Sequence, residues 1–435
     1  MIDLSSDAVA VIGFVVLFTL MLLRVPVGMA MGLVGVSGFG YLVGGTPALK
    51  MVGQTSMRIV TDYTFGVIPM FLLMGAFVTR SGMSRELFNA ANKFVGHLRG
   101  GLGLATIAAC AGFAAISGSS VATAATFSTV AYPEMRLHHY PQSFATGVIA
   151  AGGTLGAMFP PSIVLAVYGL ITQQDIGKLF MAGVIPGLLA VSMYMATIAV
   201  IGAVRPGFLP ASPRSSWTER FQAMREVWAP MLLFVFVIGG LYGGLFTPTE
   251  AGGMGAGGAF IIGIARGRLS RADVLASLLQ ATRTAAAVFT ILIGAILFGY
   301  FLTVTQTPQN VTAFVTGLGF GRYGVLVLIM LMYLVLGCLM DAMAMIILTV
   351  PIIFPVITTL GFDPIWFGVI IVMTVELGLI HPPVGMNVFV IKTVVKDVNF
   401  STIFVGVIPF VITDIIRLAI LIAFPILAVW LPSHM

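Results

Sequence analysis

Long apolar runs separated by short polar stretches dominate this chain. The runs lie at roughly 8–23, 27–44, 64–79, 101–132, 143–172, 180–204, 228–246, 249–265, 284–303, 323–360, 364–391 and 400–430. Because a helix needs about 20 apolar residues to cross a bilayer, each ordinary run predicts one crossing helix. The runs 101–132 and 323–360 are too long for a single crossing, and we interpret them as re-entrant helical hairpins. The pattern therefore predicts an all-α membrane protein with ten full crossings and two hairpins.

The distribution of Lys and Arg tests this arrangement. With two hairpins and ten crossings, both termini lie on one side of the membrane, and nearly all cations fall on the opposite side. Only four fall on the terminal side: Lys50, Arg58, Lys178 and Arg322. Since loops rich in Lys and Arg stay in the cytoplasm, both termini are expected to be periplasmic.

Composition agrees with a lipid environment. Hydrophobic residues make up 59% of the chain and charged residues 8%, whereas a soluble domain carries roughly a quarter charged residues. The net charge of +6 does not indicate a nucleic-acid partner, because the cations lie between apolar runs instead of on one face. The first run follows Asp3 and Asp7 and precedes Arg24, which predicts a spanning helix and not a cleaved signal. Cys110 and Cys338 show no metal-binding spacing.

The longest polar stretch, 205–228, divides the chain into two halves, 1–204 and 229–435. It contains Pro206, Pro210 and Pro213 and falls on the cytoplasmic side. Its second part, from about Trp217 to Trp228, predicts an amphipathic helix on the membrane surface, with a plain solvated linker as the alternative.

The two halves share one sequence register. An offset of 222 residues pairs Pro26 with Pro248, Pro133 with Pro355, Pro160-Pro161 with Pro382-Pro383, Gly156 with Gly378, and Asp175 with Asp397. After one inserted residue, Val184-Ile185-Pro186 meets Val407-Ile408-Pro409. Each half has an odd number of crossings, so the two copies are inverted relative to each other. Inverted repeats with broken helices near the midplane are typical of secondary transporters.

In the first half, the predicted site begins at the hairpin tip. Ser117, Gly118, Ser119 and Ser120 combine hydroxyls with a glycine, so an unwound tip could bind Na⁺ or substrate. Small-residue helix packing is the alternative. Further along, Gly152 and three site candidates, Gly153, Thr154 and Gly156, precede Pro160 and Pro161. Adjacent prolines after glycines predict a helix broken at membrane depth, with dipoles aimed into the gap.

The second half supplies acidic counterparts. Gly337 and Asp341 lie in its hairpin, and the offset pairs Asp341 with Ser119. A carboxylate at this depth is expensive unless it is paired or binds an ion, so Asp341 is a cation-site candidate, with helix capping as the alternative. Thr374, Glu376 and Gly378 precede the break at Pro382 and Pro383, and Asn387 follows it; Glu376 aligns with Thr154. The predicted Na⁺ ligands are Ser119, Thr154, Asp341 and Glu376. A polar tip without a ligand role is the alternative for the second break.

Other features narrow the function class. Asp414 and Arg417 stand three residues apart in the last run and are expected to pair in a structural role. The sequence has no His-Glu-x-x-His motif and no paired catalytic aspartates, so an intramembrane enzyme is not favoured. A passive channel would lack Na⁺ dependence and saturable uptake.

Several of these stretches resemble the large, DctM-like membrane subunit of tripartite ATP-independent periplasmic (TRAP) transporters. The motifs are Ile68 to Gly75, Ser117 to Thr126, Gly152 to Ser162, Gly337 to Asp341, and Glu376 to Gly385. The resemblance covers nearly the whole chain, and the two Pro-Pro motifs together are specific to this family. His381, the counterpart of Phe159, departs from the small polar residue expected there.

The resemblance implies an elevator-type transporter of the bacterial inner membrane that uses Na⁺ as coupling ion, with no ATP and no organic cofactor. It further implies a small four-helix membrane subunit, expected as a separate polypeptide because this chain starts directly with the repeat. A periplasmic binding protein would deliver an organic acid such as a C4-dicarboxylate or a sugar acid. A stand-alone divalent-anion/Na⁺ symporter of similar plan is the alternative.

Overall fold

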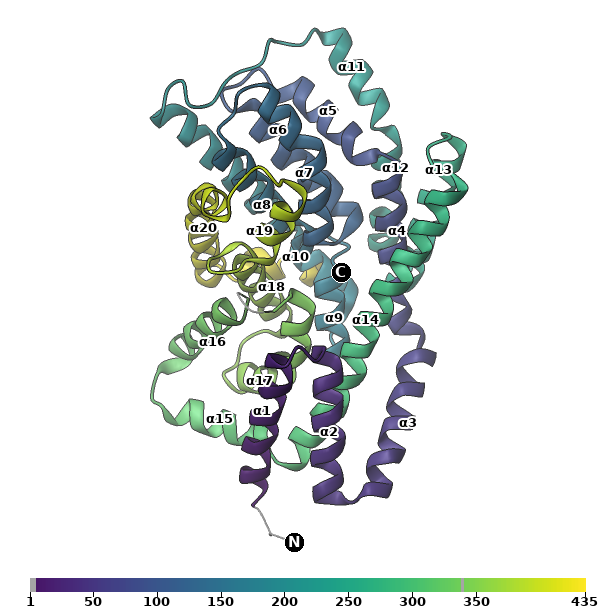
Figure 1. The fold of residues 1–435 in the computed structure, drawn as a ribbon, viewed down its shortest axis with the longest axis vertical. Coiled ribbons are helices and arrows are strands. Elements are labelled where there is room, and N and C mark those ends of the chain that lie inside the picture. Colours follow the sequence, from purple (N-terminus) through teal and green to yellow (C-terminus); the bar gives the residue numbers. More distant parts are fainter. Residues whose placement is uncertain (1–4, 338–339) are drawn as a thin grey trace.

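A computed structural model describes residues 5–337 and 340–435, and all regular structure in these ranges is helical (Figure 1). The helices of the first half are α1 (Ser6–Leu22), α2 (Val27–Val43), α3 (Gly45–Thr61), α4 (Val67–Arg80), α5 (Met83–Val95), α6 (Gly101–Ser117), α7 (Ser120–Leu137), α8 (Gln142–Met158), α9 (Ile163–Thr172) and α10 (Ile176–Val204). The rest of the chain forms α11 (Trp217–Glu226), α12 (Trp228–Tyr242), α13 (Pro248–Ala265), α14 (Arg271–Val304), α15 (Thr307–Gly317), α16 (Gly321–Gly337), α17 (Ala342–Thr359), α18 (Pro364–Ile380), α19 (Met386–Val394), α20 (Phe400–Ala423) and α21 (Ile426–Val429). The prediction of an all-α membrane protein is confirmed at this level.

The described helices differ in their capacity to cross a bilayer. Six helical segments are long and apolar enough to do so, and α11 with α12 makes a seventh if this pair, bent by 52°, is one span. Five shorter apolar helices, α1, α2, α6, α16 and α18, add to these. The count of ten full crossings stays a prediction.

Both over-long apolar runs consist of two helices. Run 101–132 contains α6 and α7, which meet at Gly118, where φ is +61°. Glycine is favoured here because it adopts positive φ at little cost. Run 323–360 contains α16 and α17, and α17 starts directly after Asp341. Of the predicted second tip, Cys338 and Leu339 lie outside the described residues.

The helices are also interrupted at both Pro-Pro pairs. Helix α8 ends at Met158 and α9 starts at Ile163, while α18 ends at Ile380 and α19 starts at Met386. Both Pro-Pro peptide bonds are cis. The breaks differ in environment, because Pro160 and Pro161 are buried whereas Pro382 and Pro383 are exposed.

The helices form two groups that meet lengthwise (Figure 1). One group, which we call the scaffold group, contains α2, α3, α4, α13 and α14, with α14 packed along α2 and α13 along α4. The other, the core group, contains the α6–α7 hairpin, α8, α9, α10, α16, α17, α18, α19 and α20. Helices α4 and α14 of the scaffold group contact α6, α9 and α17 of the core group.

The core group interlocks the two halves of the sequence. Helix α8 of the first half crosses α20 of the second, and the crossing lies at two glycines. A Cβ placed on Gly147 would lie 2.1 Å from the Gly406 carbonyl oxygen, and one on Gly406 would lie 1.8 Å from that of Ser143. Only glycine allows backbones to approach so closely, as in other small-residue crossings within membranes.

Three of the described helices, α3, α5 and α15, match neither a predicted apolar run nor the predicted linker helix. Each has an apolar stripe on an otherwise polar surface, which a search for continuous apolar runs passes over. Helix α5 is tied to the end of α13, because the Arg266 guanidinium donates to both carboxylate oxygens of Glu86 at 2.9 and 2.7 Å.

The linker contains the predicted helix, as α11. Ser216 caps it, and the Glu219 side chain in turn accepts a hydrogen bond from the Ser216 backbone N–H at 2.7 Å, which completes a capping box. Lys93 of α5 lies 3.3 Å from the Glu219 carboxylate. Helix α11 therefore lies against α5, at the end of the molecule farthest from the N-terminus in Figure 1.

Candidate functional site

A cavity of about 440 Å³ lies where the hairpin tips of the core group face the scaffold group. The first tip contributes Ser117 to Ala122, and the second contributes Asp341 to Met343. Helices α4 and α14 form the opposite wall. Its other described lining residues are Leu72, Gly75, Ala76, Thr79, Ala125, Ile163, Val164, Gln280, Thr284, Val288, Leu379 and Met386.

The first tip is an N-terminal helix end with several hydroxyls. Ser119 caps α7 by accepting a hydrogen bond from the Ala122 backbone N–H at 3.3 Å. The Ser117 and Thr123 hydroxyls lie 3.4 Å apart. Of the predicted tip residues, Ser117, Gly118, Ser119 and Ser120 all line the cavity. The N-terminus of α7 therefore presents backbone N–H groups and hydroxyls at the cavity wall.

Asp341 has the same position in the second tip. Its Oδ1 caps α17 by accepting hydrogen bonds from the backbone N–H groups of Met343 at 2.9 Å and Ala344 at 3.2 Å. Helix capping, the alternative for this residue, is thus the geometry found, and Asp341 also lines the cavity. Ser119 and Asp341, paired by the 222-residue offset, are both N-caps of the second hairpin helix.

A buried polar layer lies behind the first tip. Glu376 is 1% exposed, and its Oε1 accepts a hydrogen bond from the Ser120 hydroxyl at 3.2 Å. Its Oε2 and both amide atoms of buried Asn387 have no hydrogen-bond partner among the described residues. Burying such groups without a partner costs several kcal/mol, so unpaired polar atoms mark a place where an ion, water or ligand is expected.

Thr154, the first-half counterpart of Glu376, has its hydroxyl fully engaged. It lies 2.7 Å from the Ala151 carbonyl oxygen and 3.0 Å from the Tyr194 hydroxyl. Thr374 likewise donates to the Ile370 carbonyl of its own helix at 2.8 Å. Neither residue lines the cavity, and Glu376 and Asn387 lie outside its wall as well.

The predicted glycines act through close packing. A Cβ on Gly156 would lie 2.4 Å from the Ser119 carbonyl oxygen, and one on Gly118 would lie 2.1 Å from that of Pro161. A Cβ on Gly153 would lie 2.9 Å from the Ala124 Cβ. The break at Pro160 and Pro161 therefore supports the first hairpin tip from behind, without reaching the cavity itself.

In the second half, Gly337 and Gly378 pack against each other. A Cβ on Gly337 would lie 2.8 Å from the Gly378 Cα, and the reverse distance is 2.9 Å. Pro382 and Pro383 are exposed and do not line the cavity, although Leu379 and Met386 on either side of the break do. His381 Nδ1 lies 2.5 Å from the Pro382 carbonyl oxygen.

The scaffold wall contains polar residues that the sequence did not single out. Thr79 on α4 and Gln280 and Thr284 on α14 line the cavity, and Arg80 donates to the Gln280 side chain at 3.4 Å. These three residues could have been singled out from the sequence, because each is an isolated polar residue within an apolar stretch. Among the described lining residues there is no Lys or Arg.

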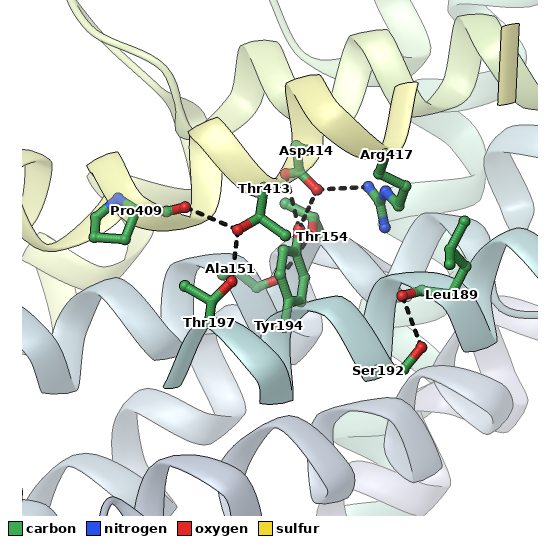
Figure 2. Close-up of polar contacts among 10 residues, drawn as sticks. All are labelled: Ala151, Thr154, Leu189, Ser192, Tyr194, Thr197, Pro409, Thr413, Asp414 and Arg417. Carbon is green, nitrogen blue, oxygen red and sulfur yellow. Dashed lines mark hydrogen bonds and ion pairs between the residues drawn. The ribbon is translucent and has the colours of Figure 1, made fainter. Parts of the chain in front are cut away.

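A second buried network joins α8, α10 and α20, and Figure 2 shows it. The predicted pairing of Asp414 with Arg417 is confirmed, at 2.8 Å between Oδ1 and Nη2. The Tyr194 hydroxyl lies 2.8 Å from each Asp414 oxygen, and the Arg417 guanidinium lies over the Tyr194 ring at 5.5 Å. Thr154 belongs to this network through Tyr194.

Comparison with known proteins identifies the family. The sequence profile of the family described as "Tripartite ATP-independent periplasmic transporter, DctM component" matches residues 14–427. The chain is 41% identical over 333 residues to the C4-dicarboxylate TRAP transporter large permease protein DctM of Pseudomonas aeruginosa, covering 76% of this chain and 78% of the relative. It is 34% identical to the protein of the same name from Rhodobacter capsulatus, covering 98% and 99%. The sialic acid TRAP transporter large permease protein SiaM of Vibrio cholerae is 32% identical, covering 94% and 95%.

A solved structure shares the fold at low sequence identity. The YdaH transporter of Alcanivorax borkumensis matches with a TM-score of 0.55 and 14% identity, over 90% of each chain. The relatives named above are all transporter permeases, so the expectation that this chain is not an enzyme is confirmed. The family and the apolar helices indicate a multi-pass protein of the bacterial inner membrane. The chain is a member of the DctM family, the large membrane subunits of TRAP transporters.

Proposed function

We propose that this chain imports an organic acid by Na⁺-coupled secondary transport with an elevator mechanism. One observation supports this most directly: the cavity lies between two helix groups, with both hairpin tips on one side and helices α4 and α14 on the other. If the core group moves as a rigid body along the scaffold group, the binding site on the core group moves with it across the membrane. The core group is the proposed mobile unit, and the scaffold group is the proposed fixed unit.

The position of the cavity along α14 gives a direction to this motion. The cavity is bordered by Gln280, Thr284 and Val288, in the first half of this helix, near the Arg-rich end assigned to the cytoplasm. A second cavity of about 450 Å³ is bordered by Leu292 to Thr303 of the same helix and by Leu170 and Ile171 of α9. We therefore propose that this structure represents an inward-facing state, with the site near the cytoplasmic side.

Oxygen atoms are the proposed Na⁺ ligands. Hydroxyls, carbonyls and carboxylates suit hard cations, and helix ends in a broken hairpin leave carbonyls free. Ser119 and Asp341 stand at the cavity, and Glu376 stands behind Ser120. Thr154, the fourth proposed ligand, is linked to Asp414 by way of Tyr194.

The proposed substrate class is supported by the names of two relatives and by the cavity. Relatives are named for C4-dicarboxylates and sialic acid, which are carboxylic acids. The described cavity wall offers no Lys or Arg, and Asp341 already accepts hydrogen bonds from backbone N–H groups at the start of α17. We therefore propose that the N-terminus of α7 and the hydroxyls beside it bind the carboxylate. Gln280 and Thr284 complete the contacts from the scaffold side.

The proposed partners are a small four-helix membrane subunit and a periplasmic binding protein. Reconstitution of this chain with both partners tests the function. We expect uptake of a C4-dicarboxylate or sugar acid that requires the loaded binding protein and an inward Na⁺ gradient. Uptake without the binding protein would favour a stand-alone symporter, and non-saturable flux without Na⁺ would favour a channel.

A further inference from the structure

Tyr194 and Arg417 occupy equivalent positions in the two halves. Each lies on the last long helix of its half, eight residues after the internal proline, Pro186 in α10 and Pro409 in α20. Thr154 and Glu376 are equivalent in the same way through the 222-residue offset. The repeat therefore predicts that the contact between Thr154 and Tyr194 has a counterpart between Glu376 and Arg417.

The structure contains the contact between Thr154 and Tyr194 but not the one between Glu376 and Arg417. Thr154 and Tyr194 lie 3.0 Å apart, but Glu376 and Arg417 form no ion pair within 4 Å in the described structure. Arg417 pairs instead with Asp414, whose first-half equivalent is Val191. The Tyr194 hydroxyl, at 2.8 Å from both Asp414 oxygens, fixes that carboxylate in place (Figure 2).

Because Arg417 pairs with Asp414, polar atoms of opposite charge on Glu376 and Arg417 are left without partners. Glu376 Oε2 and the Nε and Nη1 atoms of Arg417 are buried and have no hydrogen-bond partner in the described part of the chain. Glu376 lies close to this network, because its helix α18 packs against both α8 and α20. If all three side chains are ionised, they carry one net negative charge, which a single monovalent cation at Glu376 would neutralise. A buried charge without such compensation is costly.

We propose that Asp414 is a positioning residue, which holds the Arg417 guanidinium away from Glu376 and so leaves Glu376 available to the coupling cation. This inference rests on the proposed function, in which Glu376 is a Na⁺ ligand. Arg417 and Na⁺ are then alternative partners of one carboxylate. By binding Arg417, Asp414 and Tyr194 leave the Glu376 carboxylate free to bind Na⁺.

Removing the Asp414 charge tests the competition. In Asp414→Asn, Arg417 loses its anionic partner and turns to Glu376, so the Na⁺ concentration for half-maximal uptake should rise about tenfold. In Asp414→Asn combined with Arg417→Gln, the competitor is gone and the half-maximal concentration should return to within about threefold of wild type. Thr413→Val is the matched control, because it removes a neighbouring hydroxyl contact to Thr197 without changing charge.

The measurement uses the reconstituted complex, normalised to inserted protein. A purely structural Asp414–Arg417 pair predicts lower yield in Asp414→Asn but an unchanged half-maximal Na⁺ concentration, and that result would overturn the inference. Tyr194→Phe gives a second test if Asp414→Asn does not insert. It removes the hydroxyl that holds both Asp414 oxygens in place, and an unchanged Na⁺ dependence would also refute the proposal. Wild-type uptake that does not depend on the Na⁺ concentration would instead overturn the proposed function, and this inference with it.

Discussion

The Ser120 hydroxyl donates a hydrogen bond of 3.2 Å to Glu376 Oε1 and thereby joins the hairpin tip of the first half to the broken helix of the second. Ser120 lines the cavity, whereas Glu376 is buried behind it. A ligand in the cavity is thus one side chain away from the buried carboxylate. This contact offers a physical route by which substrate and cation occupancy can influence each other.

Asp341→Ala should lower Na⁺-driven uptake at least about tenfold while the protein remains inserted, because it removes a carboxylate from the cavity. Ser119→Ala should also lower Na⁺-driven uptake, but by a smaller factor. Uptake into vesicles, normalised to protein, measures both.

Asp363→Ala is the control for Asp341. Asp363 caps α18 with a hydrogen bond of 2.8 Å from the Trp366 backbone N–H but does not line the cavity. Asp341→Ala and Asp363→Ala should each remove about 1 kcal/mol of helix-capping free energy, so the two variants should differ in uptake and not in stability. Unchanged uptake in both Asp341→Ala and Ser119→Ala would refute the site assignment.

Gly118→Ala should destabilise the first hairpin tip by about 1–3 kcal/mol, because its Cβ would collide with the Pro161 carbonyl and the residue has positive φ. The thermal unfolding temperature in detergent should fall. Gly253→Ala in α13, where no atom lies within 4 Å of the added Cβ, should leave it unchanged or raise it slightly. Equal behaviour of the two variants would contradict the close packing of the tip.

Ser216→Ala should loosen α11 by about 1 kcal/mol, because the capping box loses its hydroxyl. Faster hydrogen exchange of the α11 amides at neutral pH would show this, with Ser215→Ala as the matched control. An unchanged exchange rate would exclude a capping role.

The cap also has a defined pH dependence. Hydrogen bonding from the Ser216 backbone N–H, and the nearby Lys93, lower the pKa of Glu219 below its usual value. Its contribution is therefore complete above the unfolded pKa of about 4.3 and is lost as the pH falls through the lower folded pKa. Protection of α11, corrected for the intrinsic pH dependence of exchange, should decline only in that acidic range.

Reporters at the chain ends test the topology. A periplasmic enzyme such as alkaline phosphatase should be active when fused to either terminus, and a fusion placed in the 205–216 linker should be inactive, because the Arg-rich side faces the cytoplasm. A C-terminal fusion that is active only in the cytoplasm would refute the orientation and the hairpin count on which it depends.

Hydrophobic run length and proline position predicted most of the core group. The hairpin turn at Gly118 and the break after Met158 fall where glycine and proline interrupt apolar runs, since these residues act locally. Helices α3, α5 and α15 escaped because their apolar positions form stripes instead of continuous apolar runs. The candidate site was also predicted only in part. Ser119 and Asp341 could be found from register, but Gln280 and the unpaired oxygen of Glu376 depend on which helices pack together.

The glycine crossing of α8 and α20 has a consequence for how the two halves can be combined. Each half of the sequence leaves a backbone surface that is covered only by the other half, with Gly147 and Gly406 in contact. The midpoint linker is thus a boundary in the sequence but not between separable modules. A half taken from a distant relative should therefore pack against the remaining half only if both helices keep a glycine at this crossing.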